Sequence, residues 1–206
     1  MNTLDLVQHG PVIPVIVIHR LEDAVPMAQA LVDGGVRVLE ITLRTPIALQ
    51  CMAAIAKAVP QAIVGAGTVR SAADAKAAFD AGCQFAVSPG YTERVGRACR
   101  DIGLPLLPGV ATASEVMAAN ADGLSFLKFF PATAAGGASL LRALAGPFPD
   151  VVFCPTGGIT VETAPQFLSL PNVKVCGGSW LTPADALEAG DWARITTLAL
   201  ATRALR

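Results

Sequence analysis

Lys128 is the residue of this sequence whose surroundings most clearly indicate chemistry. It lies between aromatic and aliphatic side chains in the run FLKFFP, residues 126–131. Lysine is rarely buried without a functional reason, and removal from water disfavours its ammonium form. The uncharged amine is a nucleophile that can form a Schiff base with a carbonyl compound. The alternative is a lysine at a strand end whose charged group reaches solvent along its aliphatic stem.

Glu40 is the second candidate, because it interrupts an apolar stretch that runs from Val36 to Thr45. Side chains alternate along a strand, and the residues that share its face are Val36, Val38, Thr42 and Arg44. If this face points into the fold, Glu40 is a carboxylate that can exchange protons with a bound substrate. The alternative is a glutamate on an edge strand in water. Arg44 could hold a substrate carboxylate with two parallel hydrogen bonds, or form an ion pair on the surface.

Glycine-rich segments predict binding sites for anionic groups. Thr68 follows Gly65-Ala66-Gly67 and places a hydroxyl beside glycine amides, although a helix N-cap would also explain it. Two glycine pairs occur in Thr156-Gly157-Gly158 and in Gly177-Gly178-Ser179. Exposed backbone N–H groups after the last two strands of a barrel often hold a phosphate. Ordinary tight turns are the alternative for a single glycine pair, and two pairs in consecutive units favour a phosphate.

Eight short apolar runs position these residues. They begin near Val12, Val36, Ala62, Gln84, Leu104, Leu124, Val151 and Val173, and each interval has room for one helix. N-terminal capping pairs are predicted at Ser71 with Asp74, Thr112 with Glu115, and Thr182 with Asp185. Alternating strands and helices imply parallel strands joined by right-handed crossovers. The sequence therefore predicts a single (β/α)8 TIM-barrel domain over residues 1–206, whose chemistry lies at the C-terminal ends of the strands. The alternative is an open doubly wound sheet, but no GxGxxG follows the first run.

The amino-acid composition argues against nucleic acid, a membrane and a metal ion as partners. The net charge is -1, and only 15% of residues are charged, without a basic stripe for nucleic acid. The five cysteines form no CxxC pair, which favours reduced thiols and a cytoplasmic location. No apolar run approaches the ~20 residues of a membrane span. The two histidines, His9 and His19, are too few for a metal-dependent mechanism, so we expect neither a metal nor another cofactor.

The order of these motifs resembles the 2-keto-3-deoxy-6-phosphogluconate (KDPG) aldolase family, which includes 4-hydroxy-2-oxoglutarate (KHG) aldolase activity. The resemblance runs nearly end to end, from residue 14 to residue 195. The segments that carry it are LEITLRT (39–45), GAGTV (65–69), SPG (88–90), PG (108–109), LKFFPA (127–132), CPTGGI (154–159) and GGSWL (177–181).

The resemblance implies a class I aldolase in which Lys128 forms the Schiff base and Glu40 is the general acid/base. It implies that the substrate is cleaved to pyruvate and glyceraldehyde 3-phosphate by a homotrimer without a cofactor. The substrate-binding residues that it implies are Arg44, Thr68, Pro89, Phe130, Thr156, Gly157, Gly158, Gly178 and Ser179. Thr156 before the glycine pair resembles the phosphogluconate branch rather than the phosphogalactonate branch. Thr133 is a departure, because relatives carry an acidic residue there, which leaves fine substrate preference open.

Other functions remain as alternatives. A sugar-phosphate epimerase, a thiamine phosphate synthase or a non-catalytic sugar-phosphate sensor could use the same barrel. The sequence also leaves open the preference among KDPG, KHG and oxaloacetate, and whether Arg20 reaches the phosphate.

Overall fold

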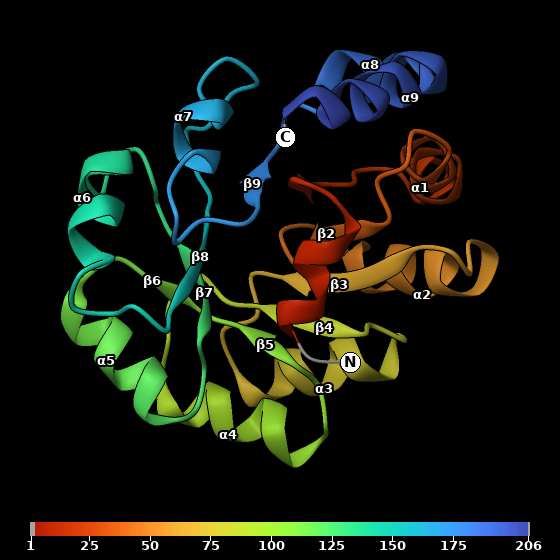
Figure 1. The fold of residues 1–206 in the computed structure, drawn as a ribbon. Coiled ribbons are helices and arrows are strands. Elements are labelled where there is room, and N and C mark those ends of the chain that lie inside the picture. Colours follow the sequence, from red (N-terminus) through yellow and green to blue (C-terminus); the bar gives the residue numbers. More distant parts are fainter. Residues whose placement is uncertain (1–2, 206) are drawn as a thin grey trace.

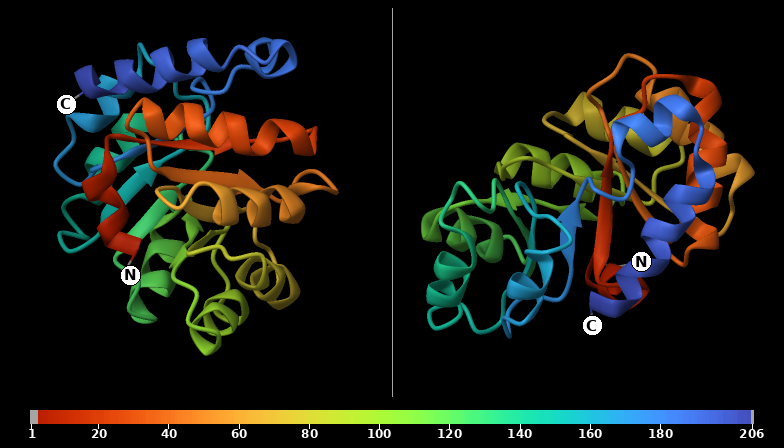
Figure 2. Two further views of the ribbon diagram at one scale, coloured as in Figure 1. Left: turned by 90° about the vertical axis from the view of Figure 1, so that its right-hand side faces the viewer. Right: turned by 90° about the horizontal axis from the view of Figure 1, so that it is seen from above.

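Parallel strands alternate with helices along the chain and form the wall of a barrel (Figures 1 and 2). The computed structural model describes residues 3–205, so residues 1, 2 and 206 of the expected domain lie outside the description. The strands are β1 (Val12–Ile16), β2 (Val38–Thr42), β3 (Ile63–Gly67), β4 (Phe85–Val87), β5 (Leu106–Leu107), β6 (Gly109–Val110), β7 (Phe126–Phe129), β8 (Val152–Pro155) and β9 (Cys176–Gly178).

Helices lie outside the strands and cover the wall (Figure 1). They are α1 (Ala24–Asp33), α2 (Ala48–Ala58), α3 (Ala72–Asp80), α4 (Glu93–Asp101), α5 (Ala113–Ala121), α6 (Gly137–Leu144), α7 (Ala164–Leu168), α8 (Ala184–Ala189) and α9 (Trp192–Ala201). Short 3-10 helices are η1 (Thr3–His9), η2 (Leu21–Asp23) and η3 (Thr202–Leu205). None of the helices within residues 3–205 is long and apolar enough to cross a membrane.

The barrel closes through two irregular junctions. Hydrogen-bonded ladders give the orders β5-β4-β3-β2-β1-β9 and β6-β7-β8. At one junction, β5 and β6 are one strand interrupted by Pro108, whose carbonyl still accepts a bond from Lys128 N at 2.8 Å. At the other, isolated bridges join β8 to the last strand, between Phe153 and Val173 and between Thr156 and Gly177. The predicted (β/α)8 architecture is therefore confirmed, with β5 and β6 together as its fifth strand.

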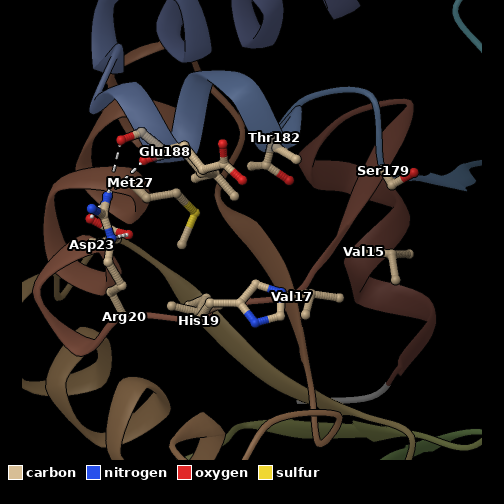
Figure 3. A pocket seen from close by; sticks show the side chains of 12 residues that line it. Val15, Val17, His19, Arg20, Asp23, Met27, Ser179, Thr182 and Glu188 are labelled. Atoms are coloured by element: carbon tan, nitrogen blue, oxygen red, sulfur yellow. Dashed lines mark hydrogen bonds and ion pairs between the residues drawn. The ribbon is translucent and has the colours of Figure 1, made fainter.

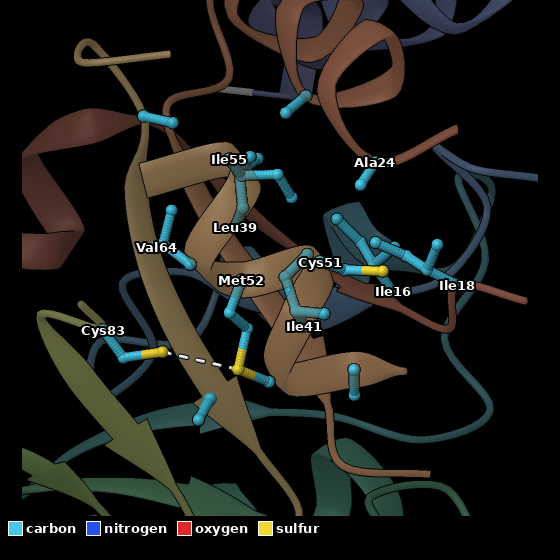
Figure 4. Packing of buried hydrophobic residues seen from close by; sticks show 14 of the residues in the cluster. Ile16, Ile18, Ala24, Leu39, Ile41, Cys51, Met52, Ile55, Val64 and Cys83 are labelled. Atoms are coloured by element: carbon cyan, nitrogen blue, oxygen red, sulfur yellow. Dashed lines mark hydrogen bonds between the residues drawn. The ribbon is translucent and has the colours of Figure 1, made fainter. Parts of the chain in front are cut away.

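Side chains alternate between the interior of the barrel and the layer beneath the helices. Ile16, Leu39, Ile41 and Val64 point outward and pack against the apolar faces of α1 and α2 (Figure 4). A separate cluster fills the interior, and its members are Leu6, Ile13, Val38, Ile63, Phe85, Val87, Leu107, Phe126, Cys154 and Val175. Leu6 comes from η1, so this helix contributes to the interior core. The polar residues Glu40 of β2 and Lys128 of β7 also point into the interior, and Cys154 of this cluster pairs in register with Lys128.

Several local predictions differ from the structure. β2 is shorter than the expected Val36–Thr45, because Val36 N donates to Leu31 O at 2.9 Å and completes the end of α1 instead. Arg44 consequently lies in a turn after the strand. The side chain of Thr182 does not cap α8, whose N-cap is Pro183 without a capping hydrogen bond.

The other two capping predictions are confirmed. Ser71 accepts from Asp74 N at 3.1 Å at the start of α3. Thr112 and Glu115 form a complete capping box on α5, since each side chain accepts from the other residue's backbone N–H. Both pairs could be recognised from sequence because a cap depends on a few consecutive residues.

Candidate active site

Lys128 and Glu40 meet inside the barrel near the C-terminal ends of β7 and β2. The Lys128 Nζ lies 3.1 Å from the Glu40 Oε1, and the two side chains are only 5% and 3% exposed. The same Nζ lies 5.2 Å from the centre of the Phe130 ring, so that a positive charge on the nitrogen is also stabilised by the ring. This burial contradicts both alternative interpretations, a solvent-directed lysine and a glutamate on an exposed edge.

Gly67 on β3 makes room for the Glu40 carboxylate. A Cβ atom at Gly67 would lie 2.5 Å from Oε1 and 2.8 Å from Cγ of Glu40, so any side chain there would displace the carboxylate. Sequence analysis did not assign this role to Gly67. The available signal was a second glycine two residues after Gly65, on the same face of a buried strand.

Cys154 borders the ion pair from the neighbouring strand, where it pairs in register with Lys128. Burial raises the pKa of its thiol to about 12, an effect that Lys128 opposes and Glu40 reinforces. A thiol with this pKa stays protonated at neutral pH and is a poor nucleophile. Cys154 therefore contributes a nonpolar wall, and the amine and the carboxylate remain the reactive groups.

A cavity of about 330 Å³ opens beside the ion pair. It brings together eight of the predicted residues, which are Arg44, Lys128, Phe130, Thr156, Gly157, Gly158, Gly178 and Ser179. Gly177, from the predicted glycine pair Gly177-Gly178, also lines it, and sequence analysis missed three more lining residues, which are Val15, Val17 and Ile159. Val15 and Val17 gave no signal beyond their position at the end of an apolar strand. The predicted phosphate segments thus lie at the same cavity as the predicted Schiff-base lysine.

The two glycine segments at this cavity are shaped by close neighbours. Gly157 and Gly158 have φ values of 103° and 74°, a region that favours glycine. The backbone of the β7–α6 loop supports them, because Thr133 N donates to Gly157 O at 3.1 Å. On the other segment, a side chain at Gly178 would overlap the ring of Trp180. These contacts hold the bare backbone of both turns at the edge of the cavity.

Arg44 and Thr68 lie side by side at the ends of β2 and β3. The Nε of Arg44 donates to the Thr68 Oγ1 at 3.4 Å. Thr68 has a φ of 65°, which is an unusual conformation for a β-branched residue. It does not cap a helix, because the N-cap of α3 is Ser71. Neither Thr68 nor Pro89 lines the cavity, and Pro89 is exposed with its carbonyl against Gly109.

Arg20 is held away from the catalytic cavity. Its guanidinium donates to both carboxylate oxygens of Asp23, at 2.8 and 3.0 Å, and to Leu187 O at 3.0 Å (Figure 3). It lines a neighbouring cavity with His19. Arg20 is therefore engaged by Asp23 and by the C-terminal half of α8 and does not line the catalytic cavity, whereas Ser179 of the second glycine segment lines both cavities. Among residues 3–205, no group of His, Cys, Asp and Glu side chains could hold a metal ion.

The barrel and the buried amine–carboxylate pair at its mouth define an enzyme of the aldolase class. Residues 4–198 match the family model described as KDPG and KHG aldolase. The KHG/KDPG aldolase of Escherichia coli K12 is 57% identical over 190 residues, which cover 92% of this chain and 89% of that relative. The chain belongs to the KDPG and KHG aldolase family.

Solved structures agree with this assignment. The KDPG aldolase of Legionella pneumophila, with pyruvate captured at low pH as a covalent carbinolamine, superposes with a TM-score of 0.93 at 46% identity over 96% of each chain. The 2-keto-3-deoxy-6-phosphogluconate aldolase of Zymomonas mobilis with 3-phosphoglycerate has a TM-score of 0.92 at 47% identity, over 98% of this chain and 95% of that one.

Proposed function

We propose that this protein cleaves 2-dehydro-3-deoxy-6-phosphogluconate to pyruvate and glyceraldehyde 3-phosphate through a Schiff base on Lys128, and that it also acts on 4-hydroxy-2-oxoglutarate. The observation that carries the proposal is the 3.1 Å contact between Lys128 Nζ and Glu40 Oε1 beside one cavity. The names of the relatives support it, because they are aldolases of these two substrates.

The first step begins with a proton transfer from Lys128 to Glu40 within the ion pair. The Lys128 amine must lose a proton before it attacks the C2 ketone, and Glu40 lies close enough to accept that proton. Attack gives a carbinolamine, and loss of water gives an iminium ion. The positive nitrogen of the iminium lies near the Phe130 ring, which favours a cation at this place.

The second step breaks the C3–C4 bond. Glu40 takes the proton of the C4 hydroxyl, glyceraldehyde 3-phosphate leaves, and the bond electrons pass through the enamine to the iminium nitrogen. A proton returned to C3 and the addition of water then release pyruvate from Lys128. A positioned acid/base of this kind contributes about 100- to 10,000-fold to a rate.

The two ends of the substrate meet different kinds of group. Arg44 and Thr68 can hold the carboxylate next to C2, because a guanidinium and a hydroxyl both donate hydrogen bonds to it. Backbone N–H groups of the Gly157-Gly158 and Gly178-Ser179 turns can hold the phosphate at the other end. Thr156 lies between these ends, and its hydroxyl donates to Cys154 O at 3.4 Å.

Reductive trapping tests the proposal. Sodium borohydride added with pyruvate should inactivate the enzyme and leave a reduced adduct, located on Lys128 by peptide mass spectrometry. The Lys128→Ala variant should form no adduct and should lose cleavage of KDPG almost entirely. Full activity after treatment, or near-normal turnover in the variant, would refute the Schiff base. A sugar-phosphate epimerase, a thiamine phosphate synthase or a sensor would show neither adduct nor cleavage.

Substrate range, assembly and location are further parts of the proposal. Initial rates with KDPG, KHG and oxaloacetate, measured by pyruvate release, would rank the three substrates. We propose a homotrimer in the cytoplasm, in line with the family resemblance and the widely spaced cysteines. Sedimentation equilibrium would test the assembly, and a monomer at working concentrations would contradict it.

A further inference from the structure

The two glycines at the end of β9 differ in their physical role from Gly157 and Gly158. Gly157 and Gly158 have φ values in the left-handed region, whereas Gly177 and Gly178 do not. The φ values of Gly177 and Gly178 therefore do not by themselves require glycine. What excludes a side chain at these two positions is space, because neighbouring side chains already occupy the place of a Cβ atom.

Gly177 and Gly178 are enclosed from opposite faces of the strand. Val175 belongs to the interior cluster and Cys176 to the cluster beneath α5, α6 and α7, so Gly177 faces the interior and Gly178 faces outward. On the inner face, a Cβ atom at Gly177 would overlap the Thr156 Oγ1 and lie 2.9 Å from the Thr156 Cγ2. The side chain of Thr156 therefore limits inward movement of this backbone.

The indole ring of Trp180 covers the outer face of Gly178. A Cβ atom at Gly178 would overlap Cε3 and Cζ3 of Trp180 and lie 2.6 Å from its Cη2. Trp180 is half-buried and packs against both clusters of the outer layer, the one beneath α1 and α2 and the one beneath α5, α6 and α7. Because the outer layer holds the ring, the ring limits outward movement of the Gly178 backbone.

The phosphate end of the catalytic cavity depends on the position of this backbone. Among the described residues that line the cavity, the cations are Arg44 and Lys128, and the proposed function places both at the pyruvate end of the substrate. The phosphate is left to backbone N–H groups and to the hydroxyl of Ser179, which follows β9 directly. A backbone N–H group cannot follow a displaced ligand as a flexible lysine can. A small shift of the Gly178-Ser179 peptide should therefore weaken its hydrogen bond to the phosphate.

We propose that Trp180 is a positioning residue for the phosphate of the substrate. It lines neither the catalytic cavity nor the cavity beside Arg20, so it acts through the Gly178 backbone. The inference rests on the proposed function, because it concerns the phosphate of KDPG. It makes Trp180 a determinant of the preference for KDPG over KHG. The distal carboxylate of KHG is bonded directly to C4, so KHG ends three atoms before the position of the phosphorus in KDPG.

Trp180→Leu removes the ring from Gly178 and tests the proposal. KM for KDPG should rise about tenfold or more, which corresponds to the loss of one hydrogen bond to a charged group. KM for KHG should stay within about twofold of the wild-type value. Exchange of the pyruvate methyl protons should continue at the wild-type rate, because Lys128 and Glu40 keep their positions. An unchanged KM for KDPG, an equal rise in KM for both substrates, or a parallel loss of exchange would overturn the positioning role.

Trp192→Leu is the matched control. Trp192 is the other tryptophan of the chain, is also half-buried, and lies at the start of α9 outside both cavities. The same loss of an indole ring there should leave KM for KDPG within about twofold of the wild-type value. A rise equal to that in Trp180→Leu would show that lost packing, and not the contact with Gly178, causes the effect.

A double-variant cycle isolates the contact between Trp180 and Gly178. In the wild-type background, the methyl group of Gly178→Ala meets the indole ring, so KM for KDPG should rise. In the Trp180→Leu background the ring is absent, and the same methyl group should raise KM by less than about twofold. Equal effects in the two backgrounds would overturn the inference. If Trp180→Leu does not fold, Trp180→Phe replaces it with the same expectations, because the shorter phenylalanine lacks the ring that overlaps Gly178.

The outcomes separate this inference from the proposed function. If borohydride traps pyruvate on Lys128 and Trp180→Leu has the wild-type KM for KDPG, only the positioning role is wrong. If no adduct forms in the wild-type enzyme, the proposed function fails, and the inference about Trp180 fails with it.

Discussion

Lys128 and Glu40 belong to strands on opposite sides of the barrel wall, yet their side chains meet with Nζ 3.1 Å from Oε1. In the ladder order, β1, β9 and β8 separate β2 from β7 on one side, and β3, β4 and the β5–β6 strand separate them on the other. The pair therefore spans the interior, where both side chains are almost fully buried. Each member depends on the other to offset the loss of its hydration.

Removal of one member of this pair should destabilise the fold. The Lys128→Met variant leaves a buried carboxylate without its partner, and we expect the free energy of unfolding at pH 7 to fall by about 3 kcal/mol. The double variant Lys128→Met/Glu40→Gln should recover most of this loss, because no uncompensated charge remains. Urea unfolding of the three proteins measures both effects. A single variant as stable as the wild type would show that the pair does not stabilise the fold.

Glu40→Gln should separate Schiff-base formation from proton transfer. The amide cannot accept a proton, so we expect kcat for KDPG cleavage to fall by about 100-fold or more. Borohydride with pyruvate should still modify Lys128 in this variant, although more slowly, because water must then accept the proton of the amine in place of Glu40. Exchange of the pyruvate methyl protons, followed by NMR in heavy water, should slow in parallel. Exchange at the wild-type rate would remove Glu40 from the mechanism.

Gly67→Ala should lower turnover by displacing the Glu40 carboxylate. The new methyl group would meet Oε1 at 2.5 Å, and a shift of about 1 Å in a catalytic group can cost roughly 100-fold in rate. Gly146→Ala is the control, because Gly146 is exposed and a Cβ atom there meets nothing within 4 Å. Steady-state kinetics should show the loss in kcat for Gly67→Ala alone. Equal activity of the two variants would show that Glu40 does not need this space.

Thr68→Gly should weaken substrate binding and raise the stability of the fold. Thr68 has a φ of 65°, and release of this strain should raise the free energy of unfolding by about 1 kcal/mol after the entropic cost of glycine. Loss of the hydroxyl should raise KM for KDPG about tenfold or more if it binds the carboxylate. Thr68→Ser keeps the hydroxyl and should keep a KM near the wild-type value. An unchanged KM in Thr68→Gly would leave Thr68 without a role in binding.

Stability should fall at alkaline pH because of buried thiols. Burial raises the pKa of Cys83 from 9.0 to about 12, so the folded protein keeps a proton that the unfolded chain releases. This contribution to stability is complete below pH 9 and is lost as the pH rises towards 12. We expect Cys83→Ala to have a slope of unfolding free energy above pH 9 that is shallower by about 1.4 kcal/mol per pH unit. Urea unfolding between pH 7 and pH 11 measures it, and identical slopes would contradict the assignment.

The sequence by itself determined the features that depend on a few neighbouring residues. The period of two along β2 grouped Glu40 with one face of its strand, and the apolar neighbours of Lys128 marked it as a buried amine. The spacing of Ser71 from Asp74 and of Thr112 from Glu115 identified two helix starts. The repeated strand–helix units predicted the barrel and the end of it where the site lies. The glycine pairs located both turns that line the catalytic cavity.

Only the tertiary structure decided which of these residues meet. Three features depend on how the strands close. They are the 3.1 Å contact of Lys128 Nζ with Glu40 Oε1, the space that Gly67 leaves for the Glu40 carboxylate, and the hydrogen bonds of Arg20 to Asp23 and to Leu187 O of α8. Strand tilt and stagger set which side chains share a layer across a barrel. These quantities arise from the packing of the whole wall, whereas the pattern within one strand fixes only the face on which a residue lies.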